Sequence, residues 1–132
     1  MKNSTYKKVY LGGSIFMSLW FGASGFLELT KNPIVWDITL QLGYPPHFIY
    51  VLGVFKVLGC IILLIPGRLN RMKEWVFAGM FFDIAFAFIS KIVVLGFPSA
   101  IDAILAFLVL MMTYYSFNKI RFINYQQKLP AC

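Results

Sequence analysis

Four long apolar runs constrain the fold of this chain more than any other feature of its sequence. A helix that crosses a membrane needs about 20 mostly apolar residues, and the runs at about 9–29, 48–65, 75–95 and 99–117 meet that need. A soluble domain of 132 residues could not bury so much apolar surface, because small domains keep much of their area exposed. The sequence therefore predicts an all-α fold, an integral membrane four-helix bundle that forms a single membrane domain over residues 1–132.

The positions of Lys and Arg predict how the bundle is oriented. Nine of the twelve basic residues lie in the two terminal segments and in the 67–74 loop, whereas the opposite side holds only Lys31. The other two, Lys56 and Lys91, fall inside helices. Cytoplasmic loops carry an excess of Lys and Arg, so we expect both termini in the cytoplasm, with residues 118–132 as a cytoplasmic tail. The net charge of +7 comes from these short clusters, which indicates a lipid bilayer as partner rather than nucleic acid.

The first apolar run has a second interpretation, a cleaved signal peptide, because Ala23-Ser24-Gly25 loosely resembles a cleavage site. A spanning helix is favoured by the length of the run. Loss of this run would also leave an odd number of helices, which conflicts with the charge pattern.

The connection between the first two runs has the pattern of a short helix. Asn32-Pro33 is a helix-start signal, and apolar residues then recur at helical spacing up to Gly43, a natural stop. We expect a short amphipathic helix over Ile34–Leu42 that lies in the outer interface. An ordinary ordered loop is the alternative.

Two opposite charges fall near the middle of the membrane. Lys56 lies about 13 Å below the outer surface and Asp83 about 12 Å above the inner one, at 1.5 Å of rise per residue. Charges inside spanning helices are costly and usually face the bundle interior. We therefore expect Lys56 and Asp83 to form a pair, with either a functional role or only the role of fixing helix register.

A second group of ionisable residues lies nearer the outside. Glu28 ends the first spanning helix, Lys91 lies late in the third and Asp102 early in the fourth. Together with the midplane pair they are the predicted ligand-binding residues of an outward-facing pocket, with Asp37 and His47 at its rim. The alternative is that Lys91 snorkels to the interface and that Glu28 and Asp102 only meet headgroup water.

No pattern identifies catalytic residues or a metal site. His47 has no neighbours at metal-ligand spacing, so no metal is expected. Cys60 and Cys132 lie far apart and form no C-x-x-C pair, which argues against a thiol–disulfide oxidoreductase that uses its own cysteines. Whether the chain is an enzyme stays open.

Several stretches resemble the DoxX-like family of small four-helix integral membrane proteins. The resemblance covers about residues 10–117 and is carried by Gly22–Leu29, Leu42–Pro45, Leu52–Gly59, Ile65-Pro66, and Lys73–Gly79 with Asp83. It implies a bacterial-type inner (plasma) membrane protein whose polar family positions are Glu28, Lys56, Glu74 and Asp83. The family takes its name from a subunit of a thiosulfate:quinone oxidoreductase, some relatives are linked to redox or stress complexes, and distant eukaryotic members look like receptor-assembly chaperones.

Three functions are compatible with these features. The first is a role in membrane redox processes, either as a subunit that binds a small lipophile such as a quinone or as an accessory subunit. Its partner would be a membrane redox protein or further copies of the same chain. The second is a non-catalytic assembly or interaction protein, and the third and weakest is a small transporter, since no inverted repeat or broken helix is evident. A cavity beside Lys56 and Asp83 would favour the first, tight packing around them the second, and a continuous water-lined path the third.

Overall fold

The structure, a computed structural model, describes residues 2–67 and 69–131. Over these residues the chain forms five α-helices and one short 3-10 helix: α1 (Lys2–Leu29), α2 (Pro33–Gln41), α3 (Pro46–Leu64), α4 (Asn70–Leu95), η1 (Phe97–Ala100) and α5 (Ile101–Lys128). Four segments, α1, α3, α4 and η1 with α5, are long and apolar enough to cross a membrane. The predicted all-α membrane bundle is confirmed.

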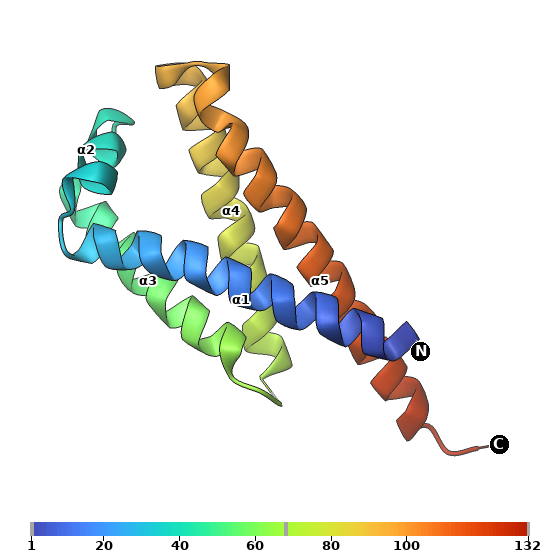
Figure 1. The fold of residues 1–132 in the computed structure, drawn as a ribbon. Helices are drawn as coiled ribbons and strands as arrows, with labels where there is room; N and C mark the ends of the chain where they lie inside the picture. Colours follow the sequence, from blue (N-terminus) through green and yellow to red (C-terminus); the bar gives the residue numbers. More distant parts are fainter. Residues whose placement is uncertain (1, 68, 132) are drawn as a thin grey trace.

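The bundle has two distinct ends (Figure 1). Both termini and the α3–α4 connection lie at one end, called the lower end here, whereas α2 and η1 lie at the other, called the upper end. Helix α1 packs against α3 and α5, and α4 packs against α5 and α3. Helices α3 and α4 come together near the lower end and diverge toward the upper end (Figure 1), and this divergence leaves room for a cavity.

The short helix predicted between the first two spanning segments is present as α2. Asn32 caps it, since its side-chain oxygen accepts a hydrogen bond from the Ile34 amide at 3.1 Å, and Pro33 occupies the first turn. Gly43 follows the helix with φ of +93°, a conformation that favours glycine. The alternative of an ordinary loop is therefore excluded.

The spanning helices are longer than the apolar runs that predicted them. Helix α1 already begins at Lys2 and α4 at Asn70, and α5 continues to Lys128, so residues 118–128 are helical instead of forming an irregular tail. The added turns carry charged and polar residues, which hydropathy alone does not include. An ion pair between Arg121 and Glu74 joins the extensions of α5 and α4.

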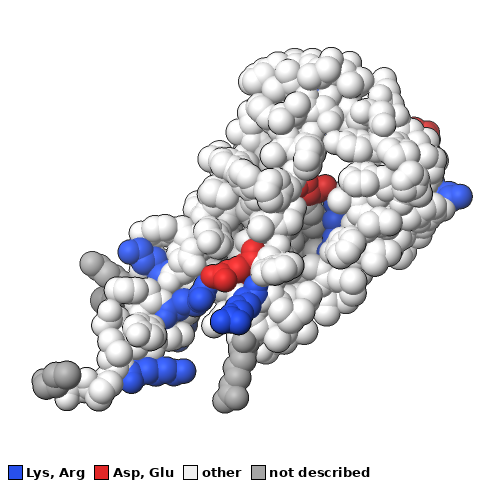
Figure 2. Space-filling model, turned by 180° about the vertical axis from the view of Figure 1, so that it is seen from behind, with Lys and Arg blue, Asp and Glu red and all other residues white. Residues whose placement is uncertain are grey.

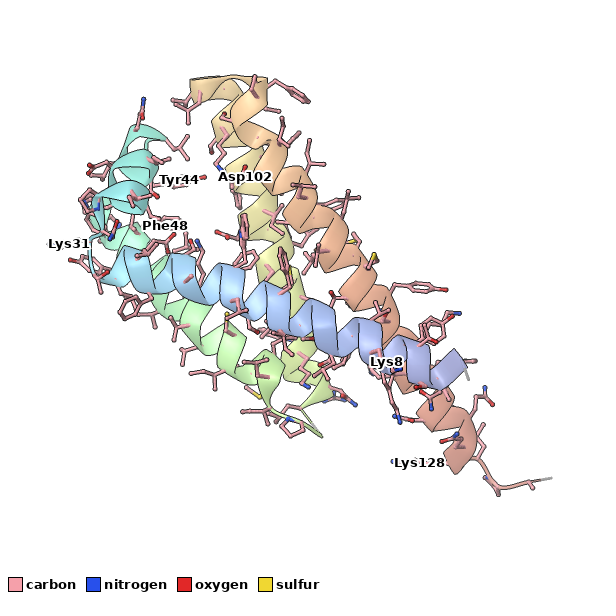
Figure 3. All side chains as sticks on the ribbon, viewed as in Figure 1. Lys8, Lys31, Tyr44, Phe48, Asp102 and Lys128 are labelled. Atoms are coloured by element: carbon pink, nitrogen blue, oxygen red, sulfur yellow. The ribbon has the colours of Figure 1, made fainter. Side chains whose placement is uncertain are left out.

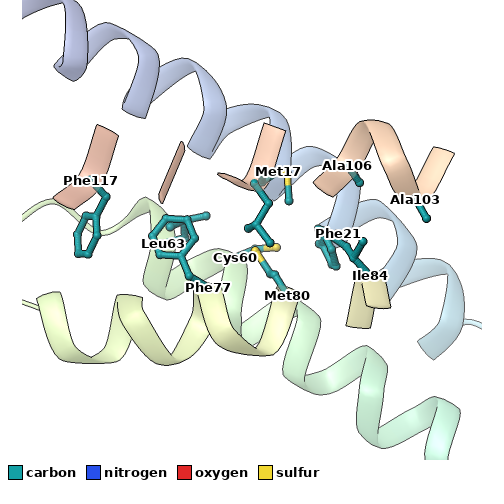
Figure 4. Packing of buried hydrophobic residues seen from close by; sticks show 11 residues of the cluster. Met17, Phe21, Cys60, Leu63, Phe77, Met80, Ile84, Ala103, Ala106 and Phe117 are labelled. Atoms are coloured by element: carbon teal, nitrogen blue, oxygen red, sulfur yellow. The ribbon is translucent and has the colours of Figure 1, made fainter. Parts of the chain in front are cut away.

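The buried core follows the line where α1, α4 and α5 meet, with contributions from α3 (Figure 4). Met17, Leu63 and Leu110 are fully buried there. Small residues let the helices approach: a Cβ added at Gly13 would lie only 2.0 Å from Thr113 Oγ1. Many large apolar side chains are exposed on the outer faces, as expected for helices whose surroundings are lipid.

Candidate functional site

Ionisable side chains from three helices meet inside the bundle. Lys56 Nζ of α3 lies 2.7 Å from Glu28 Oε1 of α1 and 3.5 Å from Asp83 Oδ2 of α4. Lys56 also donates a hydrogen bond to Ser24 Oγ at 3.2 Å, and the Ser24 hydroxyl donates to Glu28 Oε1 at 3.4 Å. The side chains of Lys56 and Glu28 are only 10% and 3% exposed. We call Ser24, Glu28, Lys56 and Asp83 the central cluster.

Glycines on α1 and α3 bring the central cluster together. A Cβ added at Gly25 would lie 2.9 Å from both Gly53 O and Lys56 Cβ, and one added at Gly53 would lie 3.0 Å from Gly25 O. These two helices therefore touch backbone to backbone, an approach that only small residues permit. Glu28 and Lys56 each lie three residues after one of these glycines and so share the close interface.

The predicted Lys56–Asp83 pair is present, but the predicted position of Glu28 is wrong. Glu28 was expected in the group nearer the outside with Lys91 and Asp102, whereas it is 2% exposed and binds Lys56. The depth estimate followed the Cα positions and ignored side-chain reach. Helices α1 and α3 are antiparallel, so Glu28 and Lys56 are displaced about 4.5 Å in opposite directions from the glycine contact. A lysine side chain is long enough to span most of that difference.

A cavity of about 830 Å³ lies against the central cluster and is called the upper cavity here. Residues from all five α-helices line it, and all four members of the central cluster are among them. Most of the lining is apolar, including Leu19, Phe48 and Phe86. Figure 2 shows the molecule hollowed, with acidic and basic atoms visible inside an otherwise uncharged opening.

A second ion pair borders the upper cavity. Lys91, late in α4, pairs with Asp102 in the first turn of α5, and both residues line the cavity. The tight α4–α5 connection through Gly96 and η1 brings them together. The two residues predicted to lie together therefore do so, as an ion pair, and Lys91 does not extend away from the bundle as the alternative supposed. Their role in ligand binding stays a prediction. The Asp102 side chain is 43% exposed, so this pair is less buried than the central cluster.

Helix α2 and Tyr44 cover part of the cavity. Ile34, Ile38 and Leu42 line it from one face of α2 and the residue after it. The hydroxyls of Tyr44 and Ser90 lie 3.0 Å apart in a hydrogen bond, which links the α2–α3 connection to α4. In Figure 3, Tyr44 and Asp102 lie on opposite sides of the space between α2 and the upper ends of α4 and α5.

Asp37 and His47 do not form the predicted rim. Both side chains are exposed and neither lines the upper cavity. Helical phase explains this: α2 turns the face of Ile34 and Ile38 inward, which points Asp37 elsewhere. On α3, Phe48 and Leu52 line the cavity at a spacing of four, and the neighbouring His47 lies about 100° around the helix from Phe48.

Sequence analysis did not predict the buried lysine at the lower end. Lys73 is 4% exposed, and its ammonium donates a hydrogen bond to the Tyr10 hydroxyl at 3.0 Å and lies 5.5 Å from the Tyr10 ring centroid. It was counted with the basic residues of a loop, because the apolar run begins only at Trp75. A prediction that α4 starts at Asn70 would have included Lys73 in the helix. Lys73 lies four residues before the buried Phe77 and therefore on the same face of α4.

The chemistry of the central cluster is that of hydrogen bonding and proton exchange. Among residues 2–67 and 69–131 there is no group of three or more His, Cys, Asp or Glu side chains that could hold a metal ion. Cys60 is buried and free. Ammonium, carboxylate and hydroxyl groups can orient a polar head group and exchange protons with it, whereas electrons would have to come from the ligand or from a partner.

Comparison with known proteins agrees with this architecture. The sequence profile of the DoxX-like family matches residues 13–114, a range that includes the central cluster and the Lys91–Asp102 pair. No curated protein and no solved structure matches the chain significantly. The case for a function therefore rests on the chain's own residues.

Proposed function

The chain belongs to the DoxX-like family, and from that premise we propose that it binds a small lipophilic, quinone-like molecule in the upper cavity. The observation that carries the proposal is a space of about 830 Å³ directly beside a buried cluster of charged side chains. Binding sites for small molecules are typically clefts of about 300–1,000 Å³, mostly apolar with a few placed polar groups. A pair that served only to fix helix register would need no such space.

The charges of the central cluster favour a head group that donates hydrogen bonds. Two carboxylates face one ammonium, so the cluster has a formal excess of one negative charge. Lys56 makes its closest contact with Glu28 and its longest with Asp83, whose side chain is 19% exposed. Asp83 is therefore the group most available to a ligand. A quinol hydroxyl that donates to Asp83 fits this arrangement better than a fatty acid, whose carboxylate would be repelled.

The rest of the cavity suits an apolar tail. Aromatic and aliphatic side chains such as Phe16, Phe82 and Phe86 line it, and all three are more than a third exposed. Their exposure means that the cavity opens toward the space that lipid occupies. A ligand dissolved in the bilayer can then enter without crossing water, with α2 over its upper side.

We further propose that the protein acts as an accessory subunit to a membrane redox partner. The central cluster can hold a quinol and take up its protons, but its side chains do not exchange electrons. The charge asymmetry supports an orientation with the lower end in the cytoplasm, and the family resemblance supports the inner membrane as the location. Lys8 and Lys128 lie at the lower end and Lys31 at the upper end (Figure 3).

Thermal unfolding in detergent with a short-chain ubiquinol tests the binding proposal. A ligand that binds only the folded state stabilises it by RT ln(1 + [L]/Kd), about 2.7 kcal/mol at one hundred times Kd. We expect the ubiquinol to raise the midpoint of unfolding of the wild type in a saturable manner. Ala87→Phe, which puts a large side chain into the upper cavity, should abolish that rise.

Ala78→Phe is the matched control. Ala78 lies on the same helix, is exposed and does not line the upper cavity, so this variant should keep the ubiquinol-dependent rise. A wild type without a saturable rise contradicts the proposal, and so does an Ala87→Phe variant that responds like Ala78→Phe.

A further inference from the structure

A second cavity of about 680 Å³, called the lower cavity here, lies between α3 and α4 on the other side of the central cluster. We propose that it holds one acyl chain of an anionic glycerophospholipid, with the phosphate of that lipid bound by Arg71. This site borders the proposed quinone-like site at Lys56 and Asp83, but the proposal does not depend on that function. The argument rests on the shape of the cavity, its lining and the charge at its lower end.

The lower cavity has the length of one membrane leaflet. Arg71 and Asp83 line its two ends on α4, and twelve residues of helix separate them, about 18 Å. The hydrocarbon half of a typical bilayer is about 15 Å thick. Lys56 and Asp83 also line the upper cavity, so the central cluster borders both cavities at mid-depth. A straight acyl chain that enters beside Arg71 therefore has the length of one leaflet available before it meets the pair.

The lining suits a hydrocarbon chain and opens sideways to lipid. Apart from Arg71 and the paired Lys56 and Asp83, the side chains that line the cavity are apolar. Phe55 and Trp75 flank it and are 67% and 83% exposed, so its open side faces the surroundings of the bundle. Trp75 lies one turn above Arg71, the level at which tryptophan marks a membrane interface.

The lower end of the cavity carries the positive charge of Arg71. Arg71 is exposed, and within residues 2–67 and 69–131 no acidic side chain forms a salt bridge with it. It lies in the first turn of α4, whose N-cap residue Leu69 has no side-chain acceptor for the first amides of the helix. Free amides at a helix start and a guanidinium both favour a phosphate. The site for the acyl chain and the site for the phosphate are therefore adjacent.

Native mass spectrometry of the delipidated protein in a non-ionic detergent tests the proposal. The probes are palmitoyl-oleoyl phosphatidylglycerol and phosphatidylcholine, which carry the same chains and differ in net charge. We expect the wild type to retain the phosphatidylglycerol preferentially. Arg71→Gln should lower that retention roughly fivefold, the effect of one basic residue near an anionic lipid surface.

Two further variants separate the site from general charge attraction. Lys128→Gln removes one exposed charge at the same end but outside the cavity and should retain the lipid like the wild type. Leu58→Trp, at a half-exposed position that lines only the lower cavity, should lower retention of both lipids. Equal retention of the two lipids by the wild type, or equal losses in Arg71→Gln and Lys128→Gln, would overturn the proposal.

Discussion

Replacing Lys56 with methionine should destabilise the protein more than replacing either of its acidic partners. The substitution removes the only ammonium that faces Glu28 and Asp83 in the central cluster. Two carboxylates then remain inside the bundle without a counter-charge. Breaking a buried ion pair by removing one partner costs on the order of 3–5 kcal/mol, and Lys56→Met should fall within this range.

The acidic substitutions should cost less, and in a definite order. Each leaves Lys56 with one carboxylate, so the loss is that of a charge-assisted hydrogen bond, about 1.5–3 kcal/mol. Glu28→Gln should lie near the upper value, because the Glu28 contact is 2.7 Å and its side chain is 3% exposed. Asp83→Asn should lie at or below the lower value, since that contact is 3.5 Å and Asp83 is 19% exposed.

The assay is equilibrium unfolding in mixed detergent micelles, followed by tryptophan fluorescence. The informative variant is the double substitution Lys56→Met with Glu28→Gln, which leaves a single acid, the more exposed Asp83. It should be less destabilised than Lys56→Met alone. If the losses of the two single substitutions simply add, or if Asp83→Asn costs more than Lys56→Met, the reasoning from a shared buried ammonium is refuted.

Three other predictions concern packing, the cover of the cavity and orientation. Gly25→Ala should lower the free energy of unfolding by several kcal/mol, since its Cβ would lie 2.9 Å from two atoms of α3. Gly12→Ala is the control, because its Cβ would meet nothing within 4 Å, and it should be neutral or slightly stabilising. Equal effects of the two substitutions in unfolding titrations would contradict the close approach of α1 and α3. Tyr44→Phe loses the hydrogen bond to Ser90, worth about 0.5–1.5 kcal/mol. Hydrogen exchange of the α2 amides should become faster, while exchange in α5 stays unchanged. Unchanged exchange in α2 would show that this hydrogen bond does not hold α2 over the upper cavity. In intact cells, a membrane-impermeant maleimide should leave Cys132 unlabelled until the membrane is permeabilised. Labelling of Cys132 from outside would contradict the proposed orientation.

Much of the fold could be predicted because hydropathy and turn residues agree along the chain. Gly96-Phe97-Pro98 separated two apolar runs correctly, and Asn32-Pro33 located the start of α2. The start of α1 and the end of α5 could not be predicted in this way. The first turns of α1 and the last turns of α5 are polar and lie outside the apolar runs, and contacts such as the Arg121–Glu74 pair depend on how the helices are placed in space.

The site was predicted in part for a related reason. Counting residues along a helix gives a depth, and depth sufficed to pair Lys56 with Asp83. It could not assign Glu28, because the distance from Glu28 to Lys56 depends on the glycine contact between α1 and α3 and on the reach of the lysine side chain. The exposed position of Asp37 depends on the rotation of α2 about its axis, which an apolar pattern of only nine helical residues defines poorly.

Photo-crosslinking with a photoreactive short-chain quinone, reduced to the quinol before irradiation and mapped by mass spectrometry, tests the central claim most directly. The upper cavity predicts adducts on cavity-lining positions of three helices, such as Ala23, Leu52 and Ala87. Unmodified ubiquinol should compete for these adducts, and Ala87→Phe should remove them. Adducts confined to outward-facing positions such as Val93, which is 78% exposed, and insensitive to competition, would contradict the account.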